Sequence, residues 1–254
     1  MLKDKIISKQ KTIGMHVSLS DPISAAIVGK AGYDFIWVDL EHSPVGFTTL
    51  LNHITAIKAG GTPVIVRVPQ NDLTYTKKVL EMGVDGIIFP MVKSAKEANE
   101  QISWTLYPPE GTRGFGPMGA VDYGDISTSE YIRINKSNLC RFIQIEHKNA
   151  VEDIENIIKN PYIDGYIFGP CDLSGSYGIP GQVFSDTITE VIRSTAKMLH
   201  ANGKYVGLST FDIETDIFEH WKSLGIDMLS AGSDYDFIRR VSKYNLKNLI
   251  EIFK

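Results

Sequence analysis

Short runs of β-branched and aromatic residues alternate along the chain with longer segments whose apolar residues recur at helical spacing. Several of the longer segments begin at a residue that can cap a helix, namely Asp21, Ser94, Ser185 and Asp212, and several end at glycine or asparagine. The short runs predict eight β-strands, at residues 12–19, 34–40, 63–68, 86–90, 141–146, 165–169, 205–209 and 228–231.

Strands that alternate with helices favour a parallel sheet, and eight such units in a chain of 254 residues predict a closed (β/α)8 TIM barrel. We expect one domain over residues 1–254, with an open doubly wound sheet as the alternative. Two connections are long, 104–139 and 173–184, and we expect both over the carboxyl ends of the strands. The glycine-rich stretch Gly114–Gly119 is expected to form a lid there, and the lysine-rich N-terminus a solvated tail.

Polar residues follow the apolar part of four predicted strands. Because strand side chains alternate between faces, Ile143 and Ile145 suit the outside of a barrel, while Gln144 and Glu146 should point into its mouth. The polar residues at the four strand ends are Asp39, Glu41, His42, Arg67, Gln144, Glu146 and Asp172.

These residue types together suggest chemistry on a 2-oxo acid. Glu146 and Asp172 suit a hard divalent cation that keeps several waters. Arg67 could bind an anionic oxygen, and His42 could serve as a general base. A cation and an arginine beside one pocket would stabilise an enolate.

Composition excludes several other classes of protein. A net charge of −4 gives no basic surface for nucleic acid, and no apolar run reaches the roughly 18 residues of a membrane span. Two cysteines, Cys140 and Cys171, cannot build a disulfide framework, which favours the cytoplasm. We therefore expect small-molecule partners and neither a nucleic-acid nor a membrane partner.

Five motifs, in the same order along the chain, resemble those of the HpcH/HpaI aldolase family of metal-dependent class II pyruvate aldolases. That family includes enzymes acting on 2,4-dihydroxyhept-2-ene-1,7-dioate and on 2-keto-3-deoxy sugar acids. The resemblance extends from about residue 12 to about residue 240. The motifs are Asp39-Leu40-Glu41-His42, Arg67-Val68-Pro69, Tyr107-Pro108-Pro109-Glu110-Gly111-Thr112-Arg113-Gly114, Gln144-Ile145-Glu146 and Phe168-Gly169-Pro170-Cys171-Asp172-Leu173-Ser174.

The resemblance implies roles for individual residues. Glu146 and Asp172 would bind Mg²⁺ or Mn²⁺, with Co²⁺ or Zn²⁺ also possible. Arg67 would bind the pyruvate oxygen and stabilise the enolate, and His42 would be the base, acting through a metal-bound water with Asp39 nearby. The remaining contacts to the pyruvate unit would come from Gln144 and from the backbone at Cys171 and Asp172.

The resemblance also implies a homo-oligomer, a hexamer built from dimers that exchange their last helix. Glu81 matches a carboxylate that pairs with the histidine of a neighbouring subunit, and residues 236–254 carry an apolar helix face suited to such docking. The chain departs from well-known members in four places. The basic residue often found after Arg113-Gly114 is missing, and Ser209 stands near the pyruvate methyl where an aliphatic residue is common. Cys171 stands where alanine is common, and His147 where threonine is common.

The expected function is that of a class II aldehyde-lyase, which reversibly cleaves a 4-hydroxy-2-oxo acid into pyruvate and an aldehyde. One alternative is a non-catalytic barrel that binds an oxo acid. A second is a related lyase or synthase acting on an acyl-CoA, or on a phosphorylated substrate held near Ser209 and residues 230–233. Gly114–Gly119 also matches a dinucleotide motif, but the stretch follows no predicted strand and opens no clear helix, so we discount a nucleotide site.

Overall fold

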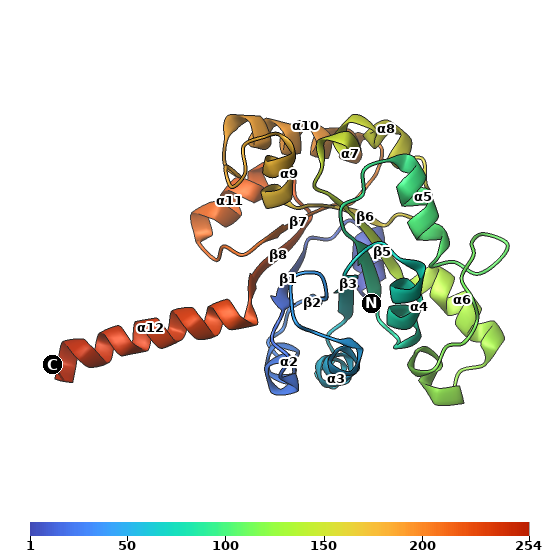
Figure 1. Cartoon of the computed structure of the whole chain (residues 1–254), viewed down its shortest axis with the longest axis horizontal. Helices are drawn as coiled ribbons and strands as arrows, with labels where there is room; N and C mark the ends of the chain where they lie inside the picture. The colour runs from blue at the N-terminus through green and yellow to red at the C-terminus, as the bar shows by residue number, and fades with distance from the viewer. Residues whose placement is uncertain (254) are drawn as a thin grey trace.

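The computed structural model, which describes residues 1–253, contains a closed barrel of eight parallel strands whose spatial order follows the order of the chain (Figure 1). All eight strands lie where the pattern of apolar residues predicts them, so the TIM-barrel expectation is confirmed. The strands are β1 (Thr12–Val17), β2 (Phe35–Asp39), β3 (Val64–Arg67), β4 (Gly86–Phe89), β5 (Cys140–Ile145), β6 (Gly165–Phe168), β7 (Val206–Thr210) and β8 (Met228–Ser233).

Helices cover the outside of the barrel, and capping side chains fix where several of them begin. Asp21, Ser94 and Ser185 accept hydrogen bonds from the first turns of their helices, as predicted, but Asp212 does not cap a helix. The helices are α1 (Leu2–Ile7), α2 (Pro22–Val28), α3 (Phe47–Lys58), α4 (Leu73–Glu81), α5 (Ala95–Ser103), the 3₁₀ helix η1 (Gly119–Gly124), α6 (Thr128–Asn138), α7 (Lys148–Glu152), α8 (Ile154–Ile157), α9 (Pro170–Ser176), α10 (Asp186–Ala201), α11 (Thr215–Ser223) and α12 (Asp234–Phe253).

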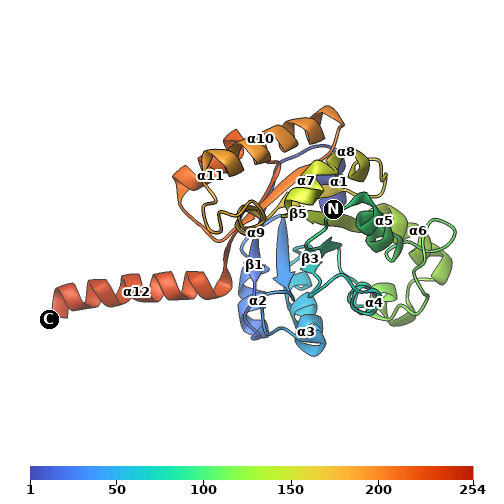
Figure 2. The same ribbon diagram turned by 45° about the horizontal axis from the view of Figure 1, so that its top comes forward.

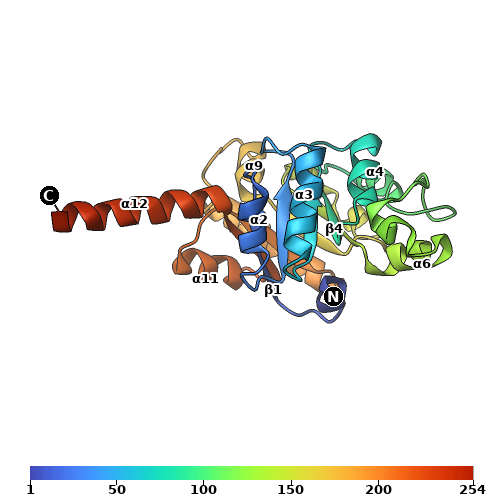
Figure 3. The ribbon, with the colours of Figure 1, turned by 90° about the horizontal axis from the view of Figure 1, so that it is seen from below.

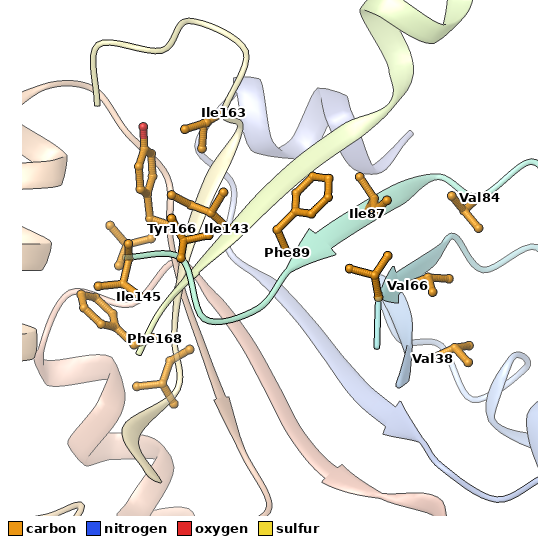
Figure 4. Close-up of a cluster of buried hydrophobic side chains, with 14 of the residues drawn as sticks. Val38, Val66, Val84, Ile87, Phe89, Ile143, Ile145, Ile163, Tyr166 and Phe168 are labelled. Atoms are coloured by element: carbon orange, nitrogen blue, oxygen red, sulfur yellow. The ribbon is translucent and has the colours of Figure 1, made fainter. Parts of the chain in front are cut away.

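Most strands contribute to two separate apolar cores, because their side chains alternate between the helices and the barrel interior. Ile143 and Ile145 belong to the core between strands and helices, part of which is shown in Figure 4. Trp37, Phe142 and Ile167 belong to a second core inside the barrel. The inward positions nearer the carboxyl ends are polar, and this polar layer lies above the inner core.

The N-terminal segment is a structural element and not a solvated tail, which corrects the sequence-based expectation. In α1, Leu2 and Ile6 are buried in the inner core of the barrel. Lys3 is also buried, forms an ion pair with Asp164 at 2.5 Å, and donates a hydrogen bond to the Leu139 carbonyl oxygen. The pattern missed this helix because six residues with two lysines show little helical periodicity.

The long connection 104–139 does not cover the mouth of its own barrel, so the expected lid is wrong. This segment leaves the end of α5 and leads into β5, and a helix-to-strand connection lies at the amino ends of the strands. Gly119 lies against the end of α4, with its carbonyl oxygen 3.1 Å from where a β-carbon on Gly83 would stand. The glycine-rich stretch therefore extends along the side of the barrel next to α4.

The last helix, α12, projects away from the barrel instead of packing beside β8 (Figures 1, 2 and 3). Asp234 fixes where it starts, because the Asp234 carboxylate accepts hydrogen bonds from the backbone N–H groups of Ser18 and Leu19, each at 3.1 Å. Within residues 1–253, no helix combines the length and the apolar character needed to cross a membrane. Tyr235 in the first turn of α12 is exposed, and the exposed apolar side chains beyond it are Ile238, Val241, Tyr244, Leu246, Leu249, Ile250, Ile252 and Phe253.

Candidate active site

A pocket of about 320 Å³ opens at the carboxyl ends of the strands. It brings together residues from β3, β5, β7 and the segments that follow β2 and β6, although these are far apart in the chain. Val183, from the long connection 173–184, also lines it, as expected for that segment. The predicted site residues that line this pocket are His42, Arg67, Gln144, Glu146, Cys171, Asp172 and Ser209.

Arg67 is held rigidly at the floor of the pocket by Asp39 on the neighbouring strand. Its Nε donates to Asp39 Oδ1 at 2.8 Å and its Nη2 donates to Asp39 Oδ2 at 2.7 Å. Burial alone would raise the pKa of Asp39, but the hydrogen bonds and charge of Arg67 hold that pKa below its usual value. Asp39 therefore stays a carboxylate beneath the pocket and positions the guanidinium above it.

The second anchored group in the pocket is the carboxylate of Glu146, which is only 1% exposed. The backbone N–H of Met91 donates to Oε1 at 2.7 Å, and Gln144 Nε2 donates to Oε2 at 2.8 Å. Met91 reaches this position with a φ of 51°, a conformation that non-glycine residues rarely adopt and that is common at functional sites. Burial raises the pKa of Glu146 to about 7, and the charges of Glu41 and Asp172 add to this effect.

Gly169 leaves the space that the Glu146 carboxylate occupies. A β-carbon at position 169 would stand 2.4 Å from Glu146 Oε2, which no side chain could tolerate without displacing the carboxylate. The glycine in the Phe168-Gly169-Pro170 motif therefore serves the site by its lack of a side chain.

The donor set fits a hard divalent cation. Within residues 1–253, no group of three or more His, Cys, Asp or Glu side chains gathers as a protein-only metal cage. Glu146 and Asp172 line one pocket, and the charges of Asp172 and Glu41 both bear on Glu146. A pair of carboxylates that leaves other positions to water and substrate is typical of Mg²⁺ and Mn²⁺ sites.

Glu41 belongs to the site, although the sequence analysis assigned it no role. Its Oε2 lies 2.9 Å from Arg67 Nη1 and 3.7 Å from His42 Nε2, so it stands between the arginine and the histidine. Burial raises the pKa of Glu41, while the charges of Arg67 and His42 act against that rise. The signal was present in the motif, since Glu41 lies two residues after the inward-facing Asp39.

Ser209 and His16 form a second hydrogen-bonded unit beside the pocket. Ser209 Oγ lies 3.0 Å from His16 Nε2, and His16 Nδ1 lies 2.9 Å from the Gly232 carbonyl oxygen. The sequence analysis did not pair these residues, because β1 and β7 are not neighbours in the chain.

Asp212, expected as a helix cap, instead accepts a hydrogen bond from Thr210 Oγ1 at 2.9 Å and lines the pocket.

Residues 230–233 do not offer an open site for a phosphate group. Ser230 and Ser233 are buried and are not among the residues that line the pocket. A β-carbon on Gly232 would stand 2.5 Å from the Phe237 ring, so that segment is tightly packed. The phosphorylated-substrate alternative gains no support from this part of the structure.

Glu81 lies away from the pocket, at the end of α4, as expected for a residue at the amino side of the barrel. Its Oε1 is buried and has no hydrogen-bond partner among residues 1–253. Gly116 of the long connection lies beside it, with a β-carbon position 3.4 Å from Oε1. The structure of one chain therefore separates Glu81 from His42.

Comparison with known proteins agrees with the fold and identifies the family of the chain. The HpcH/HpaI aldolase/citrate lyase family matches residues 12–239. A hydroxypyruvate/pyruvate aldolase of Roseobacter denitrificans is 32% identical over 209 residues, which cover 82% of each chain. A 5-keto-4-deoxy-D-glucarate aldolase of Shigella dysenteriae is 28% identical over 242 residues, which cover 95% of this chain and 93% of the relative.

The fold comparison points the same way. The crystal structure of an HpcH/HpaI aldolase from Desulfitobacterium hafniense superimposes with a TM-score of 0.91 at 28% identity, and the match covers 99% of this chain and 97% of that one. The motifs at the strand ends, the barrel and these relatives are consistent with one another. The chain belongs to the HpcH/HpaI aldolase/citrate lyase family and is an aldolase, a carbon–carbon lyase.

Proposed function

We propose that the chain reversibly cleaves a 4-hydroxy-2-oxo acid into pyruvate and an aldehyde through an enolate held in this pocket. The observation that carries the proposal is the placement of Arg67 beside Glu146 and Asp172 at the carboxyl ends of the strands. Asp39 fixes the Arg67 guanidinium before any substrate binds. The positive charge of Arg67 is therefore already directed at the position where the enolate oxygen gains negative charge.

Glu146 and Asp172 would hold the divalent ion, which we propose to be Mg²⁺ or Mn²⁺. When bound, the ion supplies Lewis-acid polarisation of the 2-oxo group. Gln144 orients Glu146 through its 2.8 Å hydrogen bond, and Arg67 Nη1 faces the same space. The backbone N–H groups at Cys171 and Asp172, in the first turn of α9, would bind the substrate carboxylate.

His42 is the group that we assign to proton transfer. Its side chain is 59% exposed at the mouth of the pocket, where a substrate hydroxyl can reach it. In the cleavage direction, the 4-hydroxyl gives up its proton, the bond between C3 and C4 breaks, and its electron pair forms the enolate. A proton returned to C3 then completes pyruvate.

The projecting α12 supports a homo-oligomer in which this helix is exchanged between subunits. An apolar groove of about 640 Å³, lined by Ile13, Tyr33, Trp221 and Leu229 among others, lies at the outer faces of β1 and β8. That is where the eighth helix of a barrel would pack, but α12 leaves it open. We propose that α12 of a second copy fills this groove, within a hexamer built from such dimers.

Assembly would also give Glu81 a partner. Its buried, unpaired Oε1 lies far from its own pocket, and we propose that it pairs with His42 of a neighbouring subunit.

Cys140 and Cys171 are both free thiols, which supports a cytoplasmic location.

The proposed function is tested by proton exchange at C3 of pyruvate in deuterated water with added Mn²⁺. We expect deuterium to enter the methyl group, and a chelator to stop the exchange. A protein that binds Mn²⁺ and pyruvate but exchanges no protons would overturn the proposal and favour the non-catalytic binding barrel.

A further inference from the structure

A buried chain of hydrogen bonds leads from β8 to the wall of the pocket. The Gly232 carbonyl oxygen lies 2.9 Å from His16 Nδ1, and His16 Nε2 lies 3.0 Å from Ser209 Oγ. His16 is only 2% exposed, and its ring packs against Trp37 and Phe211 with centroids 5.0 and 5.3 Å away. The imidazole is therefore fixed, and so are the directions of its two nitrogen atoms.

The Gly232 carbonyl oxygen determines which atom donates in each of these hydrogen bonds. A carbonyl oxygen can only accept, so His16 Nδ1 carries the proton. Burial lowers the pKa of His16 to about 4, with Arg67 acting in the same direction and Gly232 and Asp39 against it, so the ring is neutral near pH 7. Nε2 is then an acceptor, and the Ser209 hydroxyl must donate its proton to it.

Ser209 consequently presents only lone pairs to the pocket. Among residues 1–253, its Oγ makes no hydrogen bond other than the one to His16. A serine whose proton is already committed can accept a hydrogen bond from a ligand but cannot donate one. Ser209 therefore favours a ligand hydroxyl next to its Oγ, because a hydroxyl can donate. It disfavours a carbonyl or carboxylate oxygen there, because these can only accept.

The level of Ser209 in the barrel indicates which half of the substrate it meets. Phe168 on β6 pairs with Leu208 on β7, so Ser209 stands one residue further along, level with Gly169. Gly169 lies directly against the Glu146 carboxylate. Ser209 thus lines the part of the pocket beside the Glu146 carboxylate, where the proposed function places the 2-oxo acid.

We propose that Ser209, oriented by His16, makes the pocket select a 2-oxo acid donor that carries a hydroxyl group on the carbon that becomes nucleophilic. Ser209 is the specificity-determining residue and His16 is a positioning residue that acts through it. This inference rests on the proposed function, since it concerns the donor half of that reaction.

The test compares two donors of nearly equal size, hydroxypyruvate and 2-oxobutyrate, which carry a hydroxyl and a methyl group on C3. The measurement is kcat/KM for C3 proton exchange in deuterated water with Mn²⁺. We expect Ser209→Ala to lower the hydroxypyruvate to 2-oxobutyrate ratio about 10-fold, the scale of one hydrogen bond. Ser230→Ala removes a buried hydroxyl that does not line the pocket, and should leave the ratio unchanged.

His16 variants test the positioning role. His16→Leu removes the acceptor and should lower the ratio, while His16→Gln provides an amide oxygen and should restore part of it. An unchanged ratio in Ser209→Ala, with exchange of pyruvate intact in the wild type, would overturn this inference alone. Wild-type protein that exchanges none of the three donors would overturn the proposed function, and this inference with it.

Discussion

Asp39 and Arg67 form a two-point ion pair in which both side chains are almost fully buried. Because Arg67 Nε and Nη2 both bind Asp39, the third nitrogen of the guanidinium, Nη1, is directed toward Glu41 and the pocket. A guanidinium that is fixed by a carboxylate on the next strand cannot turn away from the substrate, and this rigidity is what an oxyanion-binding group requires.

Replacement of Arg67 should therefore affect the chemical step. We expect Arg67→Ala to lower kcat by at least about 100-fold, as for the loss of one oxyanion donor. Arg67→Lys should restore only part of the rate, because an ammonium cannot reproduce the fork. Steady-state kinetics with Arg193→Ala on α10 as control would check this, and a change confined to KM would contradict it.

The two carboxylates should be required for metal binding. We expect Glu146→Gln or Asp172→Asn to weaken Mn²⁺ binding and to abolish turnover while the barrel stays folded. Titration calorimetry with Mn²⁺ and circular dichroism measure the two effects separately. Glu190→Gln, an exposed residue on α10, is the control. Full activity of either variant in the presence of a chelator would contradict the assignment.

Gly169 should tolerate no side chain. In Gly169→Ala the new β-carbon would displace Glu146 Oε2, so we expect at least about 10-fold weaker Mn²⁺ binding, the scale of a disturbed ligand environment. Gly175→Ala is a matched control on α9, because a β-carbon there meets nothing within 4 Å. Equal Mn²⁺ affinity in both variants would show that the contact with Glu146 does not matter.

The buried His16 should make stability depend on pH. Its pKa is lowered from 6.5 to about 4 in the folded chain, so below pH 6.5 the unfolded chain binds a proton that the folded chain does not. The free energy of unfolding should fall as the pH drops from 6.5 toward 4. Between pH 7.5 and pH 5 we expect this loss to be smaller in His16→Gln, by about 2 kcal/mol. Urea unfolding at the two pH values measures it, and equal losses would refute the assignment.

Assembly through α12 should be needed for activity. Truncation after Tyr235 removes the exposed apolar side chains, and we expect smaller, inactive species in analytical ultracentrifugation. Mixing inactive His42→Ala subunits with inactive Glu81→Ala subunits should restore some sites with both residues intact. No recovered activity despite proven subunit exchange would mean that each barrel works alone.

The sequence was sufficient to predict the barrel and most of the pocket. Regular alternation places Gln144 and Glu146 on one face of β5, so their inward direction follows from the strand itself. The pairing of His16 with Ser209 does not, because it joins residues 193 positions apart, on two strands that are brought to either side of β8 only when the barrel closes. The expectation for residues 104–139 was wrong for another reason. The segment was taken to lie at the carboxyl ends of the strands, but it connects α5 to β5 and therefore lies at their amino ends.

The helix α1 has a consequence for the order of events during synthesis. Leu2 and Ile6 leave the ribosome before any of the eight strands, but the inner core to which they belong also contains Tyr205 and Met228, which are made much later. The floor of the barrel can therefore close only after all the strands have been made. Until then the apolar side chains of α1 have no binding place of their own, and a nascent chain must shield them by other means.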